Sequence, residues 1–117
     1  MEILNIFELS EQKESCALAL GIFDGVHIGH KALLSKAAEE AQKQGLLAAV
    51  FSIDDGAAYK KTKSLLPDKE KYTKMEDCGI KRVYTAHFSQ ICSLSPKEFV
   101  EDVLVKRLGC QIALLIV

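Results

Sequence analysis

Along the chain, four short and nearly continuous apolar runs alternate with longer stretches in which apolar residues recur every three or four positions. Apolar runs that end at turn residues are typical of strands buried on both faces of a parallel sheet, whereas the longer period is typical of helices packed on that sheet. We therefore predict an α/β fold with an open, mostly parallel sheet flanked by helices. The predicted strands span residues 16–23, 46–53, 81–88 and 110–117, with a weaker edge strand at 3–9, and the predicted helices lie at 30–44, between 67 and 79, and between 95 and 109.

The first predicted helix, residues 30–44, has one apolar stripe and one charged face. Gly45 follows it as a C-terminal stop, and Glu39 and Lys43 are expected to form a solvent-exposed pair four residues apart. Because strand, helix and strand follow one another at this spacing, we expect a parallel crossover, with a ligand above the carboxyl ends of the strands. The apolar stripe consists of Ala32, Leu33, Leu34, Ala37, Ala38 and Ala41.

The third predicted helix has the clearest start signal in the chain. Ser95 is expected to cap it, Pro96 occupies the first helical position, and Glu98 completes a capping box. Leu94 is expected to contact Phe99 across this cap. The buried stripe expected for this helix is Phe99, Val100, Val103, Leu104 and Leu108, and that of the second helix is Tyr72, Met75 and Cys78.

A glycine-rich stretch, residues 21–30, joins the first confident strand to the first helix and reads Gly-Ile-Phe-Asp-Gly-Val-His-Ile-Gly-His. Gly21, Gly25 and Gly29 remove side chains where the chain turns and where a bulky anion would approach the main chain. The N–H groups and the positive dipole end of the following helix point into the same space. We therefore predict a phosphate-binding loop.

Two of the three histidines of the chain lie in this stretch. His27 and His30 are three residues apart, so both imidazoles would share one face of the first helical turn. Ring N–H donors in that position could stabilise charge that develops on a phosphoryl group; the alternative is that each histidine caps the helix or packs on the surface. The glycine spacing does not fit G-x-G-x-x-G, and G-x-x-x-x-G-K-[ST] is absent, which disfavours dinucleotide and Walker-type ATP binding.

Composition and charge narrow the class of protein. The 117 residues are 49% hydrophobic and 26% charged, as expected for one globular domain. Fifteen basic and sixteen acidic residues give a net charge of −1, so we expect no nucleic-acid partner. The first ten residues lack the basic start of a signal peptide, and no apolar run reaches the length of a membrane span, so we expect a cytoplasmic protein with no membrane partner.

The four cysteines are widely spaced and form no C-x-x-C pair. Cys16 and Cys110 lie in or beside apolar strand-like runs. This pattern favours buried free thiols in a reducing compartment over disulfides or a metal site. The other two cysteines are Cys78 and Cys92.

Two further polar features of the sequence can each be interpreted in two ways. Segment 54–64 carries Lys60, Lys61 and Lys63, and is either a surface loop or a flap whose lysines donate to a substrate phosphate. His87 lies at the carboxyl end of a predicted strand, which is the ligand side of an open α/β sheet. It either contacts the ligand or forms a local hydrogen bond.

The glycine-rich stretch also carries a resemblance. Residues 20–34 closely resemble the opening signature of the FAD synthetase (FMN adenylyltransferase) domain of bacterial bifunctional riboflavin kinase/FAD synthetases. The His-x-Gly-His core alone is shared by many nucleotidyltransferases and class I aminoacyl-tRNA synthetases, whereas Phe-Asp-Gly-Val-His-x-Gly-His is much more specific. The resemblance covers nearly the whole chain, because it continues in order through 49–52, 65–67 with Lys71, 78–80, Phe88 and 94–100.

The resemblance implies a Rossmann-like nucleotidyltransferase fold and the transfer of AMP from ATP to FMN, which gives FAD and pyrophosphate, with Mg²⁺ bridging the ATP phosphates. It implies His27 and His30 as catalytic donors to those phosphates. Asp24 would contact a ribose or a metal-bound water, or would fix the turn. No metal site made of protein ligands alone is expected, and the flavin pocket is not located by the sequence. The residues implied for ATP binding are Gly21, Ile22, Phe23, Asp24, Gly25, His27 and His30.

The sequence also departs from the family it resembles. Residues 53–56, Ile-Asp-Asp-Gly, stand where relatives usually carry Pro-His-Pro. A Gly-x-Asp-Phe-x-Phe-Gly segment and a Ser/Thr-rich motif ending in Arg, which follow the last strand in the family, are absent. We therefore expect residues 1–117 to be an incomplete FAD synthetase-like domain, truncated at the C-terminus and without a riboflavin kinase domain. The exposed strand edge at 110–117 could drive self-association.

Two other functions stay open at this point. One is another nucleotidyltransferase, which would act on a cytidylyl or pantetheine-type substrate. The other is a non-catalytic nucleotide- or flavin-binding module. Competition by FMN separates the first alternative from an FAD synthetase, and the absence of pyrophosphate release identifies the second.

Overall fold

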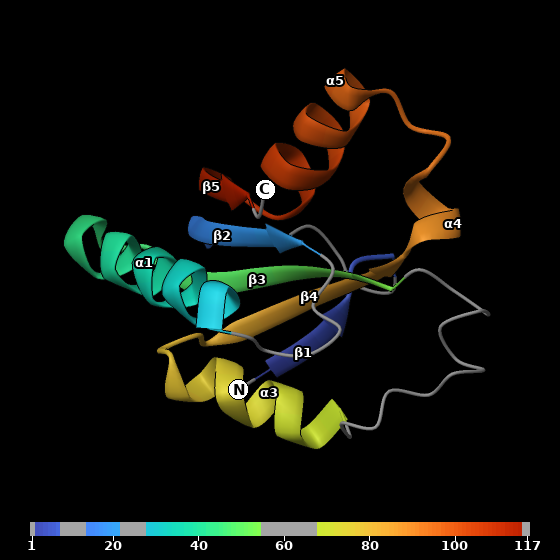
Figure 1. Cartoon of the computed structure of the whole chain (residues 1–117). Helices are drawn as coiled ribbons and strands as arrows, with labels where there is room; N and C mark the ends of the chain where they lie inside the picture. Colours follow the sequence, from blue (N-terminus) through green and yellow to red (C-terminus); the bar gives the residue numbers. More distant parts are fainter. Residues whose placement is uncertain (1, 8–13, 22–27, 55–67, 116–117) are drawn as a thin grey trace.

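The structure, a computed structural model, describes residues 2–7, 14–21, 28–54 and 68–115. Strands and helices alternate along most of this chain, as the hydrophobic pattern predicts (Figure 1). The strands are β1 (Glu2–Asn5), β2 (Cys16–Gly21), β3 (Leu47–Asp54), β4 (Arg82–His87) and β5 (Cys110–Leu115). The helices are α1 (Ile28–Gln44), α3 (Asp68–Asp77), the short α4 (Phe88–Ile91) and α5 (Pro96–Glu98), and the π-helix η1 (Phe99–Arg107).

The five strands form one sheet in the order β1-β4-β3-β2-β5, and every neighbouring pair is parallel. The predicted α/β class with an open parallel sheet is therefore confirmed. The weak prediction of an edge strand near the start is also confirmed, because β1 pairs with β4 alone. β5 is the other edge strand, and its role in self-association stays a prediction.

Helices cover both faces of the sheet (Figure 1). α1 and α3 pack on one face through Leu34, Ala37 and Met75, in a cluster that includes the small side chains of β2 and β3. η1 covers the other face through Val103 and Leu104. Because the central strands are buried on both faces, they require the continuous apolar runs seen in the sequence.

The first helix lies where the apolar stripe predicts it. α1 begins at Ile28, two residues before the predicted start, and Gly45 follows it with a φ of 67°. This left-handed conformation is the usual glycine stop of a helix. Glu39 and Lys43 form the predicted exposed pair, with Nζ 3.3 Å from Oε1.

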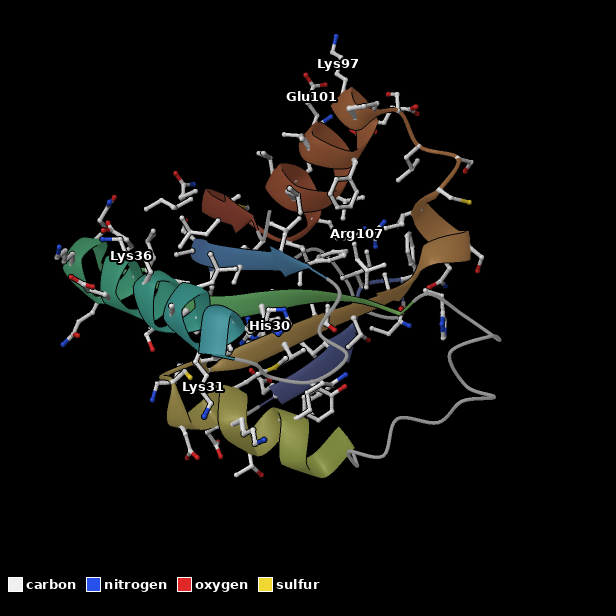
Figure 2. The ribbon with its side chains drawn as sticks, viewed as in Figure 1. His30, Lys31, Lys36, Lys97, Glu101 and Arg107 are labelled. Carbon is white, nitrogen blue, oxygen red and sulfur yellow. The ribbon has the colours of Figure 1, made fainter. Side chains whose placement is uncertain are left out.

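The third predicted helix starts as the capping signal indicates. The Glu98 N–H donates to the Ser95 hydroxyl at 3.1 Å, and the Ser95 N–H donates to the Glu98 carboxylate at 3.0 Å. Phe99 then packs edge-on against Phe51 of β3, with ring centroids 5.6 Å apart. At the other end of η1, Arg107 donates to the Ile6 carbonyl at 3.2 Å (Figure 2).

The predicted burial of Val100 is wrong, because this side chain is 48% exposed. The helix is π-helical over Phe99–Arg107, with hydrogen bonds between residues five positions apart, such as Leu108 N–H to the Val103 carbonyl at 3.1 Å. Each residue then advances less around the axis than in an α-helix. Phe99, Val103 and Leu108 stay on the sheet side, and Val100 turns away from it.

At the amino end of the sheet, a buried arginine joins three segments. Arg82, the first residue of β4, is 7% exposed. Its guanidinium donates to the Glu2 carboxylate at 2.6 and 2.9 Å, to Glu14 at 2.9 Å and to the Tyr84 hydroxyl at 3.2 Å. Burial opposes the charge, but these hydrogen bonds raise the pKa of Arg82 above its usual value. The cation therefore links β1 and the segment just before β2 to β4.

All four cysteines are free thiols, as predicted. The expectation that they are buried is confirmed for Cys16 and wrong for Cys92, which is exposed. Cys92 follows the end of α4 in a turn, so its side chain faces solvent instead of the sheet. Cys78 and Cys110 are half-buried.

Candidate functional site at the carboxyl end of the sheet

The carboxyl ends of the three central strands meet at one edge of the sheet. Gly21, the last residue of β2, lies opposite Ser52 of β3, which in turn lies opposite Thr85 of β4. Asp54 and His87, the last residues of β3 and β4, are also opposite each other. In open parallel sheets, this end is the one at which ligands bind.

α1 begins at the same end of the sheet, after the connection from Gly21 to Ile28. His30 lies in the first turn of this helix and is half-buried (Figure 2). The first N–H groups of a helix have no partner inside it, and the dipole of a 17-residue helix adds positive potential there. An imidazole on this turn can add an N–H donor for an anion.

The structure describes two of the seven residues predicted for the site. Gly21 ends β2 and is half-buried, and His30 is in the first turn of α1. Because β2 and α1 are consecutive elements, both residues belong to the strand-to-helix connection that the sequence predicts. The others, Ile22, Phe23, Asp24, Gly25 and His27, lie outside the described residues, as do Lys60, Lys61 and Lys63 of the predicted flap.

His87 has the position that the sequence predicts, at the end of β4, and it is half-buried. Its backbone N–H donates to the side-chain oxygen of Gln90 at 2.9 Å, so the following turn is fixed by a local contact. The position of Asp54 beside His87 was not predicted. Pairing of β3 with β4 brings them together, and the signal available was that each ends an apolar run.

Lys71 on α3 is a second feature that the sequence pattern did not single out for burial. Its side chain is 9% exposed, and Nζ lies 5.1 Å from the centre of the Tyr72 ring. A lysine within a polar helix is normally taken as solvated, so only the packing of α3 on the sheet reveals this burial.

Within the described ranges, no group of three or more His, Cys, Asp or Glu side chains could hold a metal ion. None of the helices in these ranges is long and apolar enough to cross a membrane. The described part of this edge presents the amino end of α1 with His30 and the ends of the central strands.

Comparison with known proteins extends this picture. The sequence matches the family model described as FAD synthetase over residues 9–115. It is 38% identical over 95 residues to the bifunctional riboflavin kinase/FMN adenylyltransferase of Listeria monocytogenes, covering 75% of this chain and 30% of that protein. The Escherichia coli protein of the same name is 34% identical over 113 residues, covering 91% of this chain and 36% of its own length.

The Bacillus subtilis relative with that name is 31% identical over 104 residues, which cover 83% of this chain and 33% of the relative. The chain thus spans about a third of the length of these curated relatives. Among solved structures, one titled as a macrolide-efflux protein from Streptococcus pneumoniae superimposes with a TM-score of 0.75 at 25% identity. That match covers 98% of this chain and 48% of the other, which supports the fold described above.

Proposed function

We propose that this chain, which belongs to the FAD synthetase family, is an FMN adenylyltransferase that uses ATP to convert FMN into FAD and pyrophosphate. The observation that carries the proposal is the family match over residues 9–115, which includes the glycine-rich loop and all of α1. The relatives' names join two activities. We propose the adenylyl transfer alone, because the matching family model is the one described as FAD synthetase.

In the proposed reaction, an oxygen of the FMN phosphate forms a bond to the α-phosphorus of ATP. The bond from that phosphorus to the oxygen bridging the β-phosphate breaks, and pyrophosphate leaves. The FMN phosphate is already an anionic nucleophile, so the protein has to align the two phosphates and stabilise the charge that develops. No proton transfer from the nucleophile is needed.

His30 is proposed to stabilise that charge together with His27. His30 is in the first turn of α1, where the helix amino end supplies positive potential. A ring N–H donor in this position would strengthen its hydrogen bond as negative charge accumulates on the phosphate oxygens. Main-chain N–H groups from Gly21 to Gly25 are proposed to complete the phosphate site.

Mg²⁺ belongs to the proposal as part of the substrate, the Mg-ATP complex. Mg²⁺ usually keeps several waters and binds to substrate phosphates, so it is proposed to arrive on the nucleotide. The chain's own residues would then bind the nucleotide and align FMN with it. A flavin site, one FAD synthetase-like domain over residues 1–117 and a cytoplasmic location are further parts of this proposal.

The proposal is tested by incubating the purified chain with FMN, ATP and Mg²⁺ and following FAD by chromatography. A His27→Ala/His30→Ala variant is expected to form FAD at least about 100-fold more slowly, because it lacks both proposed transition-state donors. Lys36→Ala is the matched control. Lys36 is on the same helix and its side chain is 54% exposed beside Glu40, so the rate should not change.

The other outcomes separate the alternatives. Mg-ATP binding that the double variant lacks, without FAD or pyrophosphate release, would refute catalysis and identify a nucleotide-binding module. Turnover of a cytidylyl or pantetheine-type substrate in preference to FMN would identify another nucleotidyltransferase. Equal rates in the double variant and the Lys36→Ala control would refute the assignment of the two histidines.

A further inference from the structure

Two cysteines lie beside each other at the amino end of the sheet, away from the proposed active site. Cys16 is the first residue of β2 and Cys110 is the first residue of β5, and the two are partners in the pairing of these strands. The strands β2 and β5 are neighbours in Figure 1. Neighbouring strands lie about 4.8 Å apart. That spacing falls within the range of about 4.4 to 6.8 Å between the Cα atoms of disulfide-bonded cysteines.

A β-bulge places both side chains on the same face of the sheet. Cys110 pairs with Cys16, but the next residue of β2, Ala17, pairs with Ile112, so Gln111 is an extra residue in β5. Cys110 packs with Cys16 on the face covered by η1, whereas Ile112 packs on the face covered by α1. In a regular strand, residues 110 and 112 would share a face. The bulge therefore turns Cys110 toward Cys16.

The backbone around the two cysteines is closely packed. The Cys16 N–H donates to the Gly109 carbonyl at 3.0 Å, and a Cβ at Gly109 would lie 2.7 Å from the Glu14 carbonyl oxygen. Each sulfur is also near a main-chain carbonyl: Cys16 Sγ is 3.3 Å from the Leu108 oxygen, and Cys110 Sγ is 3.3 Å from the Ile112 oxygen. The start of β2 is thus bound to residues 108 and 109, directly before β5, through its N–H and its thiol.

From this geometry we propose that Cys16 and Cys110 form a dithiol site that hydroperoxides oxidise to an intramolecular disulfide, which a small dithiol reduces again. The proposal does not depend on the proposed adenylyl transfer. A disulfide between directly paired strands has Cα atoms near the short end of the usual range, and strained disulfides of this kind are readily reduced.

The two thiols have different roles in this reaction. Cys110 is half-buried, whereas Cys16 has no exposed surface. The neighbouring Cys16 thiol lowers the pKa of Cys110, whereas the neighbouring Cys110 thiol together with burial raises the pKa of Cys16. The thiolate is the nucleophile in thiol oxidation, so Cys110 is the thiol that reacts with peroxide and Cys16 is the thiol that resolves it.

The reaction balances in two steps. The Cys110 sulfur attacks one peroxide oxygen: an S–O bond forms, the O–O bond breaks, and the departing hydroxide takes the thiol proton as water. The Cys16 sulfur then attacks the Cys110 sulfur: the S–S bond forms, the S–O bond breaks, and hydroxide leaves with the Cys16 proton as a second water. The sum is two thiols and one hydrogen peroxide giving one disulfide and two waters.

The test uses the full chain with Cys78→Ser and Cys92→Ser, so that only the pair remains. Hydrogen peroxide is added under native conditions, free thiols are counted after denaturation, and peptides are mapped without reduction. We expect both thiols to be lost, a Cys16–Cys110 peptide within one chain, and full recovery with dithiothreitol. The oxidised chain should also unfold at a higher urea concentration than the reduced chain, because the cross-link restricts the unfolded state.

Two variants in this background assign the roles. Cys110→Ser should leave the buried Cys16 thiol unreacted, and Cys16→Ser should stop at a Cys110 sulfenic acid that dimedone labels. The proposal is overturned if both thiols survive a peroxide dose that oxidises Cys92 of the original chain, which is its most exposed thiol. Disulfides between chains, or equal loss of the Cys16 thiol in the Cys110→Ser variant, would also overturn it.

Discussion

The two ends of the sheet are built from different kinds of contact. At the amino end, residues far apart in the sequence meet: Arg82 binds Glu2 and Glu14, and Gly109 lies against the backbone of Glu14. At the carboxyl end, the Gln90 side chain binds the His87 N–H three residues earlier, and the Thr85 hydroxyl reaches the Leu4 carbonyl of the neighbouring strand only at 3.5 Å. Hydrogen-bonded ion pairs between remote segments stabilise the fold at the amino end, whereas strand ends and helix starts gather at the carboxyl end.

This difference has a physical reason. Parallel strands with helical crossovers place every strand end and the following helix start on one side, where backbone groups are available to a ligand. The opposite side receives the helix ends and strand starts, and contacts there can be buried without obstructing a ligand. Variants at the amino end should therefore change stability without changing the chemistry, and this separation can be tested.

The largest loss of stability at the amino end is expected from Arg82→Ala. This change removes four hydrogen bonds and the buried stem of the arginine, but the two carboxylates are 60% exposed and become hydrated. We therefore expect the free energy of unfolding to fall by about 3 kcal/mol, the lower part of the range for breaking a buried ion pair. Urea denaturation measures this value.

The exposed pair of Lys106 with Asp102 provides the control for Arg82→Ala. Nζ and Oδ1 are 3.7 Å apart and the lysine side chain is 73% exposed, so Lys106→Ala should cost less than about 0.5 kcal/mol. The folded fraction of the Arg82→Ala variant should form FAD at the original rate. If Arg82→Ala and Lys106→Ala lower the free energy of unfolding equally, the contacts of Arg82 do not stabilise the amino end of the sheet.

Gly109→Ala is expected to have the next largest effect. The φ of this residue is 67°, and a Cβ would lie 2.7 Å from the Glu14 carbonyl oxygen, so strain adds to a backbone clash. We expect a loss of about 2 kcal/mol in the free energy of unfolding. Gly45 has the same φ with nothing within 4 Å, so Gly45→Ala should cost only about 1 kcal/mol. If Gly109→Ala and Gly45→Ala lower the free energy of unfolding equally, the clash of the new Cβ with the Glu14 carbonyl oxygen does not destabilise the fold.

The sequence predicts features that depend on neighbouring residues. The run in β2 is apolar and that in β3 is nearly so because both faces are covered, and the capping box requires only Ser95 and Glu98. The strand order, the burial of Arg82 and the bulge at Gln111 depend on segments that are remote in the sequence. Polar residues such as Arg82 and Lys71 therefore read as solvated until the tertiary packing is known.

The candidate site also has one part that the sequence predicts and another part that it does not predict. The connection from β2 to α1 is predictable, because the glycine-rich stretch between Gly21 and His30 lies between a strand pattern and a helix pattern. The neighbourhood of Asp54 and His87 was not predictable, because it requires the register between β3 and β4. The exposure of Val100 could not be predicted either, because the π-helical winding of η1 places this residue on the solvent-facing side.

The smallest effect is expected from the local contact between Glu98 and Ser95. The charge of Glu98, unlike that of Arg82, changes as the pH is lowered. The hydrogen bond from the Ser95 N–H is the main reason that the pKa of Glu98 lies below its ordinary value of 4.5. The Ser95 hydroxyl lowers this pKa further. A carboxylate with a lowered pKa in the folded state stabilises it fully above that ordinary value, and this contribution is lost as the pH falls through the folded-state pKa. Thermal unfolding of the original chain and of Glu98→Gln measures the difference in Tm.

Glutamine keeps an acceptor oxygen but does not titrate, so the original chain should have the higher Tm at neutral pH. The difference should shrink as the pH is lowered below 4.5. In a Ser95→Ala background, which lacks the hydroxyl, Glu98→Gln should change Tm less at neutral pH, since the remaining capping contact is weaker. A Tm difference that stays constant from neutral to acid pH would show that the Glu98 charge does not stabilise this helix start, and that only the uncharged hydrogen bonds do.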